Sequence, residues 1–192
     1  MIRIGILGDI GSGKSYIAKQ FGYPVFNADQ EVGKLYKKDK QIFYRLKKEL
    51  PKYIYKFPIN KEQVTKAILS NKINLKKIIK VVHAKTKRKM FIFLKKNKNK
   101  KIVILDIPLL LENRINKKND VLIFVNAKKD LIRKKLKKRK NYNQKLINKF
   151  KKIQLPLVYK KKKSHFIIKN DFTEKTVKKY VKNILRKIKW KK

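Results

Sequence analysis

Short apolar runs alternate with amphipathic stretches along this chain, which is the pattern of strands alternating with helices. The apolar runs predict buried strands over residues 2–7, 23–26, 102–105, 121–125 and 165–168. Helical spacing predicts helices over 14–21, 30–50 with a break near 38–39, 61–70, 75–94, 128–140, 144–163 around Pro156, and 174–188. Strands separated by helices favour a parallel sheet that is covered on both faces, so we expect a three-layer α/β fold.

The chain's 192 residues contain no internal repeat and no linker, so we expect a single domain. Its parts would be a core over 1–38, 95–133 and 164–192, a helical subdomain over about 39–94, and a mobile lid over about 134–163. Ligands of parallel α/β sheets bind beyond the carboxyl ends of the strands, which is where we expect the functional site.

The loop after the first predicted strand carries the strongest motif. It matches G-x-x-x-x-G-K-[ST] at every fixed position, as Gly8-Asp9-Ile10-Gly11-Ser12-Gly13-Lys14-Ser15. Glycines allow successive backbone N–H groups to point at an anion, a lysine reaches the β- and γ-phosphates, and a serine hydroxyl binds magnesium. A glycine-rich turn without a ligand is disfavoured, because a strand precedes the motif and a helix follows it. We therefore expect an ATP site formed by Gly8, Gly11, Ser12, Gly13, Lys14, Ser15 and Tyr16.

Two aspartates follow predicted strands. Asp106 ends the apolar run 102–105, where an acid could help to hold magnesium or merely satisfy the end of the strand. Asp29 follows the second strand, where it could be a general base or an N-cap of the helix predicted from Gln30. The residues alone leave these two roles of Asp29 equally open.

The order and spacing of these segments resemble the dephospho-coenzyme A kinase family over nearly the whole chain. The resemblance rests on the Gly8–Ser15 loop, on Asn27-Ala28-Asp29, on His83, and on Asp106-Ile107-Pro108-Leu109-Leu110-Leu111-Glu112-Asn113. The Pro-Leu-Leu-Leu-Glu segment discriminates, because many families share the glycine loop. The resemblance implies a P-loop kinase fold that transfers the γ-phosphate of ATP to the ribose 3′-hydroxyl of dephospho-CoA, the last step of coenzyme A biosynthesis.

The resemblance also implies roles for particular residues. Asp29, Lys14 and the lid residue Arg139 would be catalytic, and Asp29, His83 and Asp106 would bind the substrate. Ser15 and Asp106 would hold the Mg²⁺ that accompanies ATP. On residue pattern alone His83 lies on an apolar helix face, which favours a core role over a substrate contact.

The chain departs from the family's pattern at a few of these positions. Asn27 replaces the first acid of an Asp-Ala-Asp triplet, and Ala84 replaces the proline after His83. Asp9 stands where a small residue is common, and lysines replace most lid arginines. These departures bear on catalytic efficiency more than on identity, and a weakened kinase is one alternative that they suggest.

The formal net charge of +45 suggests a nucleic-acid-binding protein as another alternative. However, the excess consists of 50 lysines against 7 arginines, spread along the whole chain, which favours a solvated surface. We therefore expect no specific nucleic-acid partner; another small-molecule P-loop kinase remains the enzymatic alternative. The chain has no cysteine and no apolar run near the ~20 residues of a membrane span. We expect a cytoplasmic monomer that binds ATP and dephospho-CoA and no membrane.

Overall fold

The computed structural model describes residues 1–189, which separate into two compact units. The first, called the sheet unit, contains Met1–Asn27, Asn97–Tyr142 and the chain from Gln154 onward. The second, called the helical unit, contains Ala28–Lys96 and Asn143–Ile153. Each unit is described by itself below.

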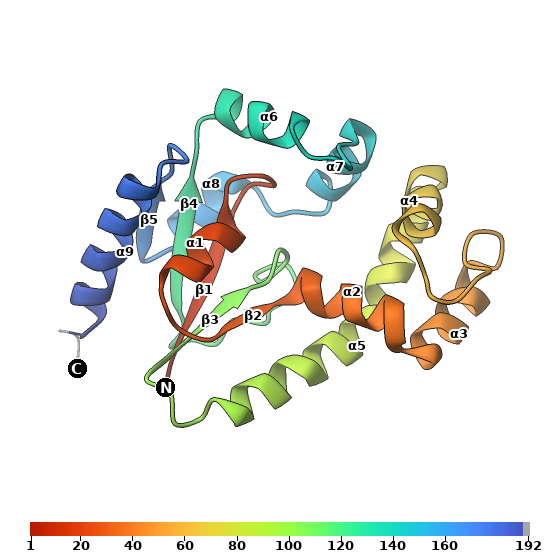
Figure 1. The fold of residues 1–192 in the computed structure, drawn as a ribbon, viewed down its shortest axis with the longest axis horizontal. Coiled ribbons are helices and arrows are strands. Elements are labelled where there is room, and N and C mark those ends of the chain that lie inside the picture. The colour runs from red at the N-terminus through yellow and green to blue at the C-terminus, as the bar shows by residue number, and fades with distance from the viewer. Residues whose placement is uncertain (190–192) are drawn as a thin grey trace. The chain divides into compact units, whose positions relative to one another are not determined.

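The sheet unit is built on a five-stranded sheet in the order β2-β3-β1-β4-β5 (Figure 1). Its strands are β1 (Ile2–Gly8), β2 (Val25–Asn27), β3 (Ile102–Asp106), β4 (Val121–Asn126) and β5 (Phe166–Lys169). Every neighbouring pair is parallel, so the predicted parallel sheet is confirmed. The carboxyl ends of the strands therefore lie at one edge of the sheet, where β1 leads into the glycine loop.

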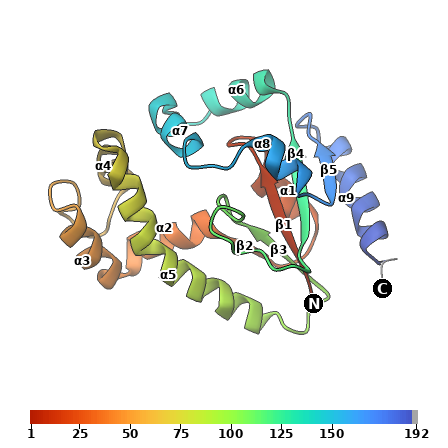
Figure 2. The same cartoon turned by 180° about the vertical axis from the view of Figure 1, so that it is seen from behind.

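Helices cover both faces of this sheet. The helices of the sheet unit are α1 (Lys14–Gln20), α6 (Lys129–Lys137), α8 (Leu157–Lys162) and α9 (Glu174–Lys189). Helices α1 and α9 pack on one face, and α8 packs against β1 on the other, as Figures 1 and 2 together show. The predicted three-layer arrangement is therefore confirmed.

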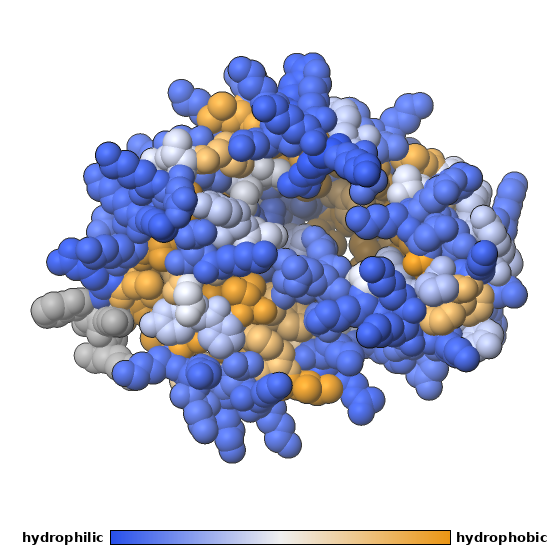
Figure 3. All heavy atoms as spheres, viewed as in Figure 1, coloured by the Kyte–Doolittle hydropathy of each residue, from blue (hydrophilic) through white to orange (hydrophobic). Residues whose placement is uncertain are grey.

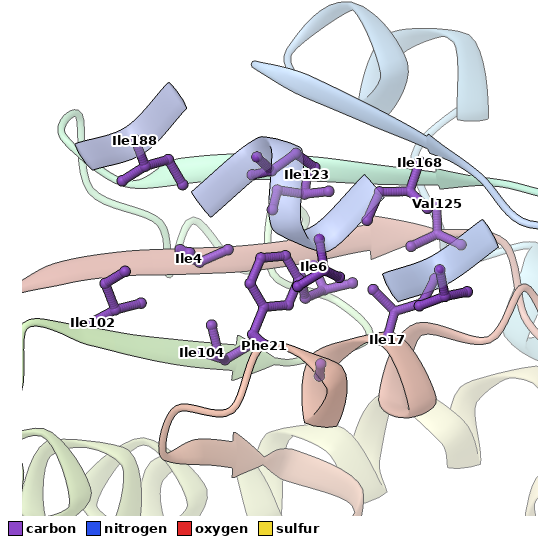
Figure 4. Close-up of a cluster of buried hydrophobic side chains, with 14 residues drawn as sticks. Ile4, Ile6, Ile17, Phe21, Ile102, Ile104, Ile123, Val125, Ile168 and Ile188 are labelled. Carbon is purple, nitrogen blue, oxygen red and sulfur yellow. The ribbon is translucent and has the colours of Figure 1, made fainter. Parts of the chain in front are cut away.

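The core between the sheet and helices α1 and α9 consists of aliphatic side chains and one phenylalanine (Figure 4). Its buried members are Ile4, Ile6, Ile17, Ala18, Phe21, Ile102, Ile104, Ile123, Val125, Ile168, Val177, Val181, Ile184 and Ile188. Alternation along β1 sends Gly5 to the opposite face, where a Cβ would come within 2.5 Å of Leu110. The missing side chain thus lets the Pro-Leu-Leu segment pack directly on β1.

The helical unit contains α2 (Ala28–Lys38), α3 (Lys40–Glu49), α4 (Lys61–Ser70), α5 (Lys72–Lys96) and α7 (Gln144–Lys151). Its core is formed by Leu35, Ile42, Phe43, Leu46, Leu50, Ile54, Ile59, Ala67, Ile68, Leu75, Ile78 and Val82. Asp39 separates α2 from α3, and its carboxylate caps α3 by accepting a hydrogen bond from the N–H of Ile42 at 3.0 Å. The helix break predicted near 38–39 is confirmed, and the cap supplies its physical reason.

Most predicted boundaries differ from the observed ones by one to three residues, and three of the differences change how an element is read. The single helix predicted over 144–163 is wrong: α7 ends at Lys151, and α8 begins after Pro156, which has no N–H to continue a helix. Strand β2 begins at Val25, not at residue 23, and α2 begins at Ala28, not at Gln30. The functional division into core, substrate subdomain and lid stays a prediction.

Hydrophilic side chains, in blue, dominate the face seen in Figure 3, as the lysine-rich composition requires. No helix within residues 1–189 is long and apolar enough to cross a membrane.

Candidate active site

The loop between β1 and α1 adopts a tightly curled conformation. Gly11 and Gly13 have φ values of 83° and 94°, in the left-handed region where a side chain would strain the backbone. The N–H of Ser12 donates to the carbonyl of Asp9 at 3.2 Å and closes the turn. This curl brings successive N–H groups together at the start of α1, which is the geometry of an anion-binding nest.

Lys14 folds back over the same loop. Its ammonium group donates to the carbonyl of Asp9 at 2.7 Å and to that of Gly8 at 3.2 Å. The Asp9 carboxylate accepts a hydrogen bond from the N–H of Ile10 at 2.7 Å, within its own loop. A positive charge is thereby held over the backbone nest, where it can neutralise an anion bound to those N–H groups.

Two other segments of the sheet unit support the loop. Asn170, at the end of β5, is 3% exposed and donates to the carbonyl of Ser12 at 2.8 Å. A Cβ at Gly13 would lie 2.5 Å from the amide nitrogen of Asn170, and a Cβ at Gly11 would lie 2.8 Å from Leu136 of α6. These glycines are therefore needed for close approach as well as for backbone conformation.

Sequence reasoning assigned no role to Asn170 or Leu136. Only one feature of the sequence could have pointed to Asn170: it follows the last predicted strand, at the sheet edge where ligands bind. Leu136 gave no signal at all, because its contact depends on how α6 folds back onto the loop.

Asp106 lies at the carboxyl end of β3, the strand between β1 and β2. Its carboxylate is 3% exposed and accepts a hydrogen bond from the side-chain amide of Asn27, with 2.5 Å between Nδ2 and Oδ2. Asn27 and Asp106 are register partners on adjacent strands, so the pairing follows directly from the sheet.

The donor groups at this edge suit magnesium. Mg²⁺ prefers oxygen ligands and is commonly held by one or two protein groups, with phosphates and waters completing its shell. The Asp106 carboxylate and the hydroxyl of Ser15, which is exposed in the first turn of α1, are ligands of that kind. No cluster of three or more metal-ligating side chains exists within residues 1–189, so a caged metal is not indicated there.

Asp29 belongs to the helical unit and is the second residue of α2. The predicted N-cap role is therefore wrong, because the helix begins one residue earlier and Asp29 lies inside its first turn. Burial raises the pKa of the Tyr36 hydroxyl, and the negative charge of Asp29 raises it further. Asp29 thus lies close enough to Tyr36, two helical turns along α2, for its charge to act on that hydroxyl.

The remaining predicted site residues lie in less informative surroundings. His83 is half-buried on α5 beside the core residue Val82, and its Nε2 is buried with no hydrogen-bond partner among the described atoms. Arg139 is exposed in the turn after α6, three residues beyond Leu136. Tyr16 is 43% exposed on α1.

A parallel five-stranded sheet whose first strand runs into a lysine-bearing anion nest defines the P-loop kinase class. The family model for dephospho-CoA kinase matches residues 2–176. The chain therefore belongs to the dephospho-CoA kinase family, as its sequence predicts.

Individual relatives and solved structures agree with this assignment. The dephospho-CoA kinase of a Wolbachia species from Brugia malayi is 35% identical over 187 residues, which cover 95% of each chain. A crystal structure from Thermus thermophilus covers 97% of each chain with a TM-score of 0.78 at 24% identity. The dephospho-CoA kinase from Campylobacter jejuni has a TM-score of 0.61 at 21% identity and covers 97% of this chain and 96% of its own. These two structures establish the likeness of fold.

Proposed function

We propose that this chain transfers the γ-phosphate of ATP to the ribose 3′-hydroxyl of dephospho-CoA, giving coenzyme A in the last step of its biosynthesis. The observation that carries the proposal is the family match over residues 2–176, which includes the Gly8–Ser15 loop, Asp29 and Asp106. The expected setting is the cytoplasm and the expected state a monomer.

The glycine loop would hold the phosphates. Backbone N–H groups of Gly11 to Ser15 would bind the β- and γ-phosphate oxygens, and the Lys14 ammonium would exchange its carbonyl partners for them. Phosphoryl transfer needs little covalent chemistry from the protein, so catalysis consists mainly of positioning and charge neutralisation. The curl imposed by Gly11 and Gly13 prepares that environment before the nucleotide binds.

Magnesium bound with ATP would neutralise charge on the phosphates, and Ser15 and Asp106 are the residues that would hold it. The Asn27 amide fixes one oxygen of the Asp106 carboxylate, which orients the group without adding a second negative charge.

Asp29 would accept the proton of the 3′-hydroxyl as that oxygen attacks the γ-phosphorus and the bond to ADP breaks. Arg139, from the turn after α6, would balance charge on the transferred group. His83, with a buried nitrogen that no described protein atom satisfies, would donate to or accept from the substrate.

The test is an assay of ADP release by the purified chain with Mg²⁺ and ATP, comparing dephospho-CoA with a panel of nucleosides, nucleotides and shikimate. We expect kcat/KM to be at least about 100-fold higher for dephospho-CoA, because a site that pairs with a substrate's polar groups rejects analogues lacking them. Mass spectrometry should find one added phosphate, and phosphorus NMR should place it on the 3′-oxygen. A preference for another acceptor would contradict the proposal.

A further inference from the structure

Strand β5 is the last strand of the sheet. It pairs with β4 alone, and no other strand of residues 1–189 lies beyond it (Figure 1). The N–H of His165, just before β5, donates to the carbonyl of Leu122 in β4 at 2.8 Å. Because the backbone groups of successive strand residues point in alternate directions, those of Phe166 and Ile168 point to the outer edge. This edge can therefore form hydrogen bonds with a further strand.

A groove with a volume of about 920 Å³ lies between β5 and helix α9. Its α9 wall includes Tyr180, Ile184 and Lys187, whose spacing of four and three positions puts them on one stripe of the helix. Ile184 is buried and Tyr180 is half-buried, and on the β5 side Ile167 is 38% exposed. An apolar surface therefore lies beside the outer edge of β5.

The exposed side chains of α9 that line this groove are cationic or neutral. They are Asn183, Arg186 and Lys187, and no described residue that lines the groove is acidic. Arginine binds a carboxylate through two parallel hydrogen bonds, so an acidic partner suits these residues. A second copy of this chain carries the same net charge of +45 and would be repelled. Charge complementarity therefore favours an acidic partner over a second copy.

We propose that the outer edge of β5 and this groove bind an extended acidic segment of another protein by strand addition. The segment would pair with the backbone of Phe166 and Ile168 and place alternate aliphatic side chains against the groove. Its carboxylates would pair with Arg186 and Lys187. The groove lies beside the start of β5, whereas Asn170 contacts the phosphate loop from beyond the end of that strand. The proposal therefore does not rest on the proposed function.

A synthetic peptide tests the mode of binding. The probe is a fluorescently labelled peptide of about eight residues in which glutamate alternates with valine, as in a strand with one apolar face. Fluorescence anisotropy measures its Kd for the full chain at about 0.15 M salt, where charges more than ~8 Å apart are largely screened.

Two further peptides carry the same charge as the probe. One has all its glutamates before its valines, which removes the alternation. The other has N-methyl groups on two adjacent central residues, one of which must face β5 in a paired strand. We expect the Kd to rise at least about 10-fold for each, because hydrogen bonds or apolar contacts are lost.

Two double variants separate the groove from the general positive charge. Arg186→Gln with Lys187→Gln removes two charges that line the groove. Lys179→Gln with Lys182→Gln removes two charges from exposed positions of the same helix that do not line it. The first should raise the Kd of the probe about fivefold or more, and the second less than about twofold. Ile167→Thr, which keeps a β-branched side chain, should also weaken binding.

Hydrogen exchange shows where the peptide binds. The amide hydrogens of Phe166 and Ile168 should exchange more slowly when the probe is bound. The amide hydrogen of His165 already pairs with Leu122, so its exchange should change little.

Four results would overturn strand addition and leave the proposed function intact, because the phosphate loop takes no part in it. Equal Kd values for the three peptides would mean that charge alone attracts them. Failure of the alternating peptide to bind would mean that this edge takes no acidic strand. Unchanged exchange at Phe166 and Ile168 would place the peptide elsewhere. A dimer that sedimentation detects in the parent and not in Ile167→Thr would show that a second copy occupies the edge.

Discussion

The side-chain amide of Asn27 donates a hydrogen bond to the buried carboxylate of Asp106 across the β2–β3 pair, with 2.5 Å between nitrogen and oxygen. In the family's pattern an acid stands at the position of Asn27. The chain therefore has one negative charge where that pattern has two. An amide can donate a hydrogen bond to its carboxylate neighbour, whereas a second carboxylate would repel it unless a proton or a cation lay between them.

Asn27→Asp should destabilise the protein in a pH-dependent way. Two carboxylates within hydrogen-bonding distance should cost about 1–3 kcal/mol of unfolding free energy at pH 8, and less at pH 5, where the pair can share a proton. If Asp106 holds magnesium, Mg²⁺ should raise the thermal midpoint of the variant more than that of the parent. Thermal unfolding at both pH values, with and without Mg²⁺, measures this.

Asn27→Ala is the control for that experiment, because it removes the hydrogen bond without adding a charge. Its loss of stability should be the same at pH 5 and pH 8. A pH-independent midpoint in Asn27→Asp as well would mean that the two side chains separate freely and that their pairing does not constrain Asp106.

Lys14→Ala should lower turnover by about 10²–10³-fold or more, because it removes the charge that neutralises the transferred phosphate. Its ammonium donates to the carbonyls of Gly8 and Asp9 within its own loop, so the thermal midpoint should change little. Lys19→Ala, at an exposed position of the same helix, should leave both quantities unchanged. Near-parental turnover in purified Lys14→Ala would show that the glycine loop does not take part in phosphoryl transfer.

The sequence predicted the parts of the fold that depend on local pattern. Mainly apolar runs indicated the strands, because strands that are buried on both faces carry few polar residues. The helix break at Asp39 was also visible, because a capping residue marks it locally. The split between α7 and α8 was missed because the interval 144–163 keeps helical spacing on both sides of Pro156.

The candidate site was predictable only where a motif spans adjacent residues. The glycine loop and Asp106 could be placed from sequence because each follows directly from one strand. The support of that loop by Asn170 could not, since that residue is separated from Gly13 by more than 150 positions and meets it only through the order of strands in the sheet. The left-handed conformation of Phe172, whose φ is 67°, has no sequence signal, because a phenylalanine there contradicts local preference.

Asp39 should make the stability of the helical unit depend on pH in the acid range. Burial acts to raise the pKa of its carboxyl, but hydrogen bonds with Lys85 and with the N–H of Ile42, together with the charge of Lys85, outweigh burial and lower it. Because the pKa of Asp39 is lower in the folded state, its ionised carboxylate stabilises the fold at pH values above the ordinary aspartate pKa of about 4. This stabilisation is lost as the pH falls through the pKa of the folded state.

Asp39→Asn keeps a capping side chain but removes the titrating charge. Its unfolding free energy should therefore lie below the parent's at pH 7, and the difference should shrink as the pH falls below about 4. Urea unfolding of both proteins at pH 7, 5 and 3 measures the difference. Lys85→Met should also make the unfolding free energy depend less on pH in this acid range. A difference between parent and Asp39→Asn that stays constant over this range would contradict the assignment.

Glu112 and Lys160 form a buried ion pair, with 2.7 Å between the ammonium and carboxylate atoms and Lys160 only 1% exposed. Glu112 also accepts from the N–H of Leu155 at 2.9 Å, so the pair ties the segment after β3 to the start of α8. Glu112→Gln should cost about 3–5 kcal/mol, because it leaves the buried ammonium without an opposite charge.

The double variant Glu112→Leu with Lys160→Met should recover most of that loss, because it buries no charge and fills a similar volume. Chemical unfolding of Glu112→Leu, of Lys160→Met and of the double variant gives the coupling between the two sites. Independent, additive losses would show that the ion pair is not the source of the effect.

Asp29 and Glu31 are the two acids in the first turn of α2, which makes them a matched pair. Both favour the helix through its dipole, by roughly 0.3–1 kcal/mol each. Glu31 forms an ion pair with Lys34 of the same helix at 2.5 Å, and the charge of Asp29 raises the pKa of the Tyr36 hydroxyl. If Asp29 serves the helix alone, replacing either acid by its amide should have the same small effect on stability and none on catalysis.

The proposed general base makes a different prediction for the two positions. Asp29→Asn keeps the size of the side chain but cannot take up the proton of the acceptor hydroxyl, so turnover with dephospho-CoA should fall by about 10²–10⁴-fold. Affinity for ADP should barely change, because Gly11 to Ser15 hold the phosphates. Glu31→Gln should lose a similar small amount of stability and keep parental turnover. Steady-state kinetics and thermal unfolding of both variants decide the matter: equal turnover in Asp29→Asn and Glu31→Gln would leave Asp29 with a role in the helix only.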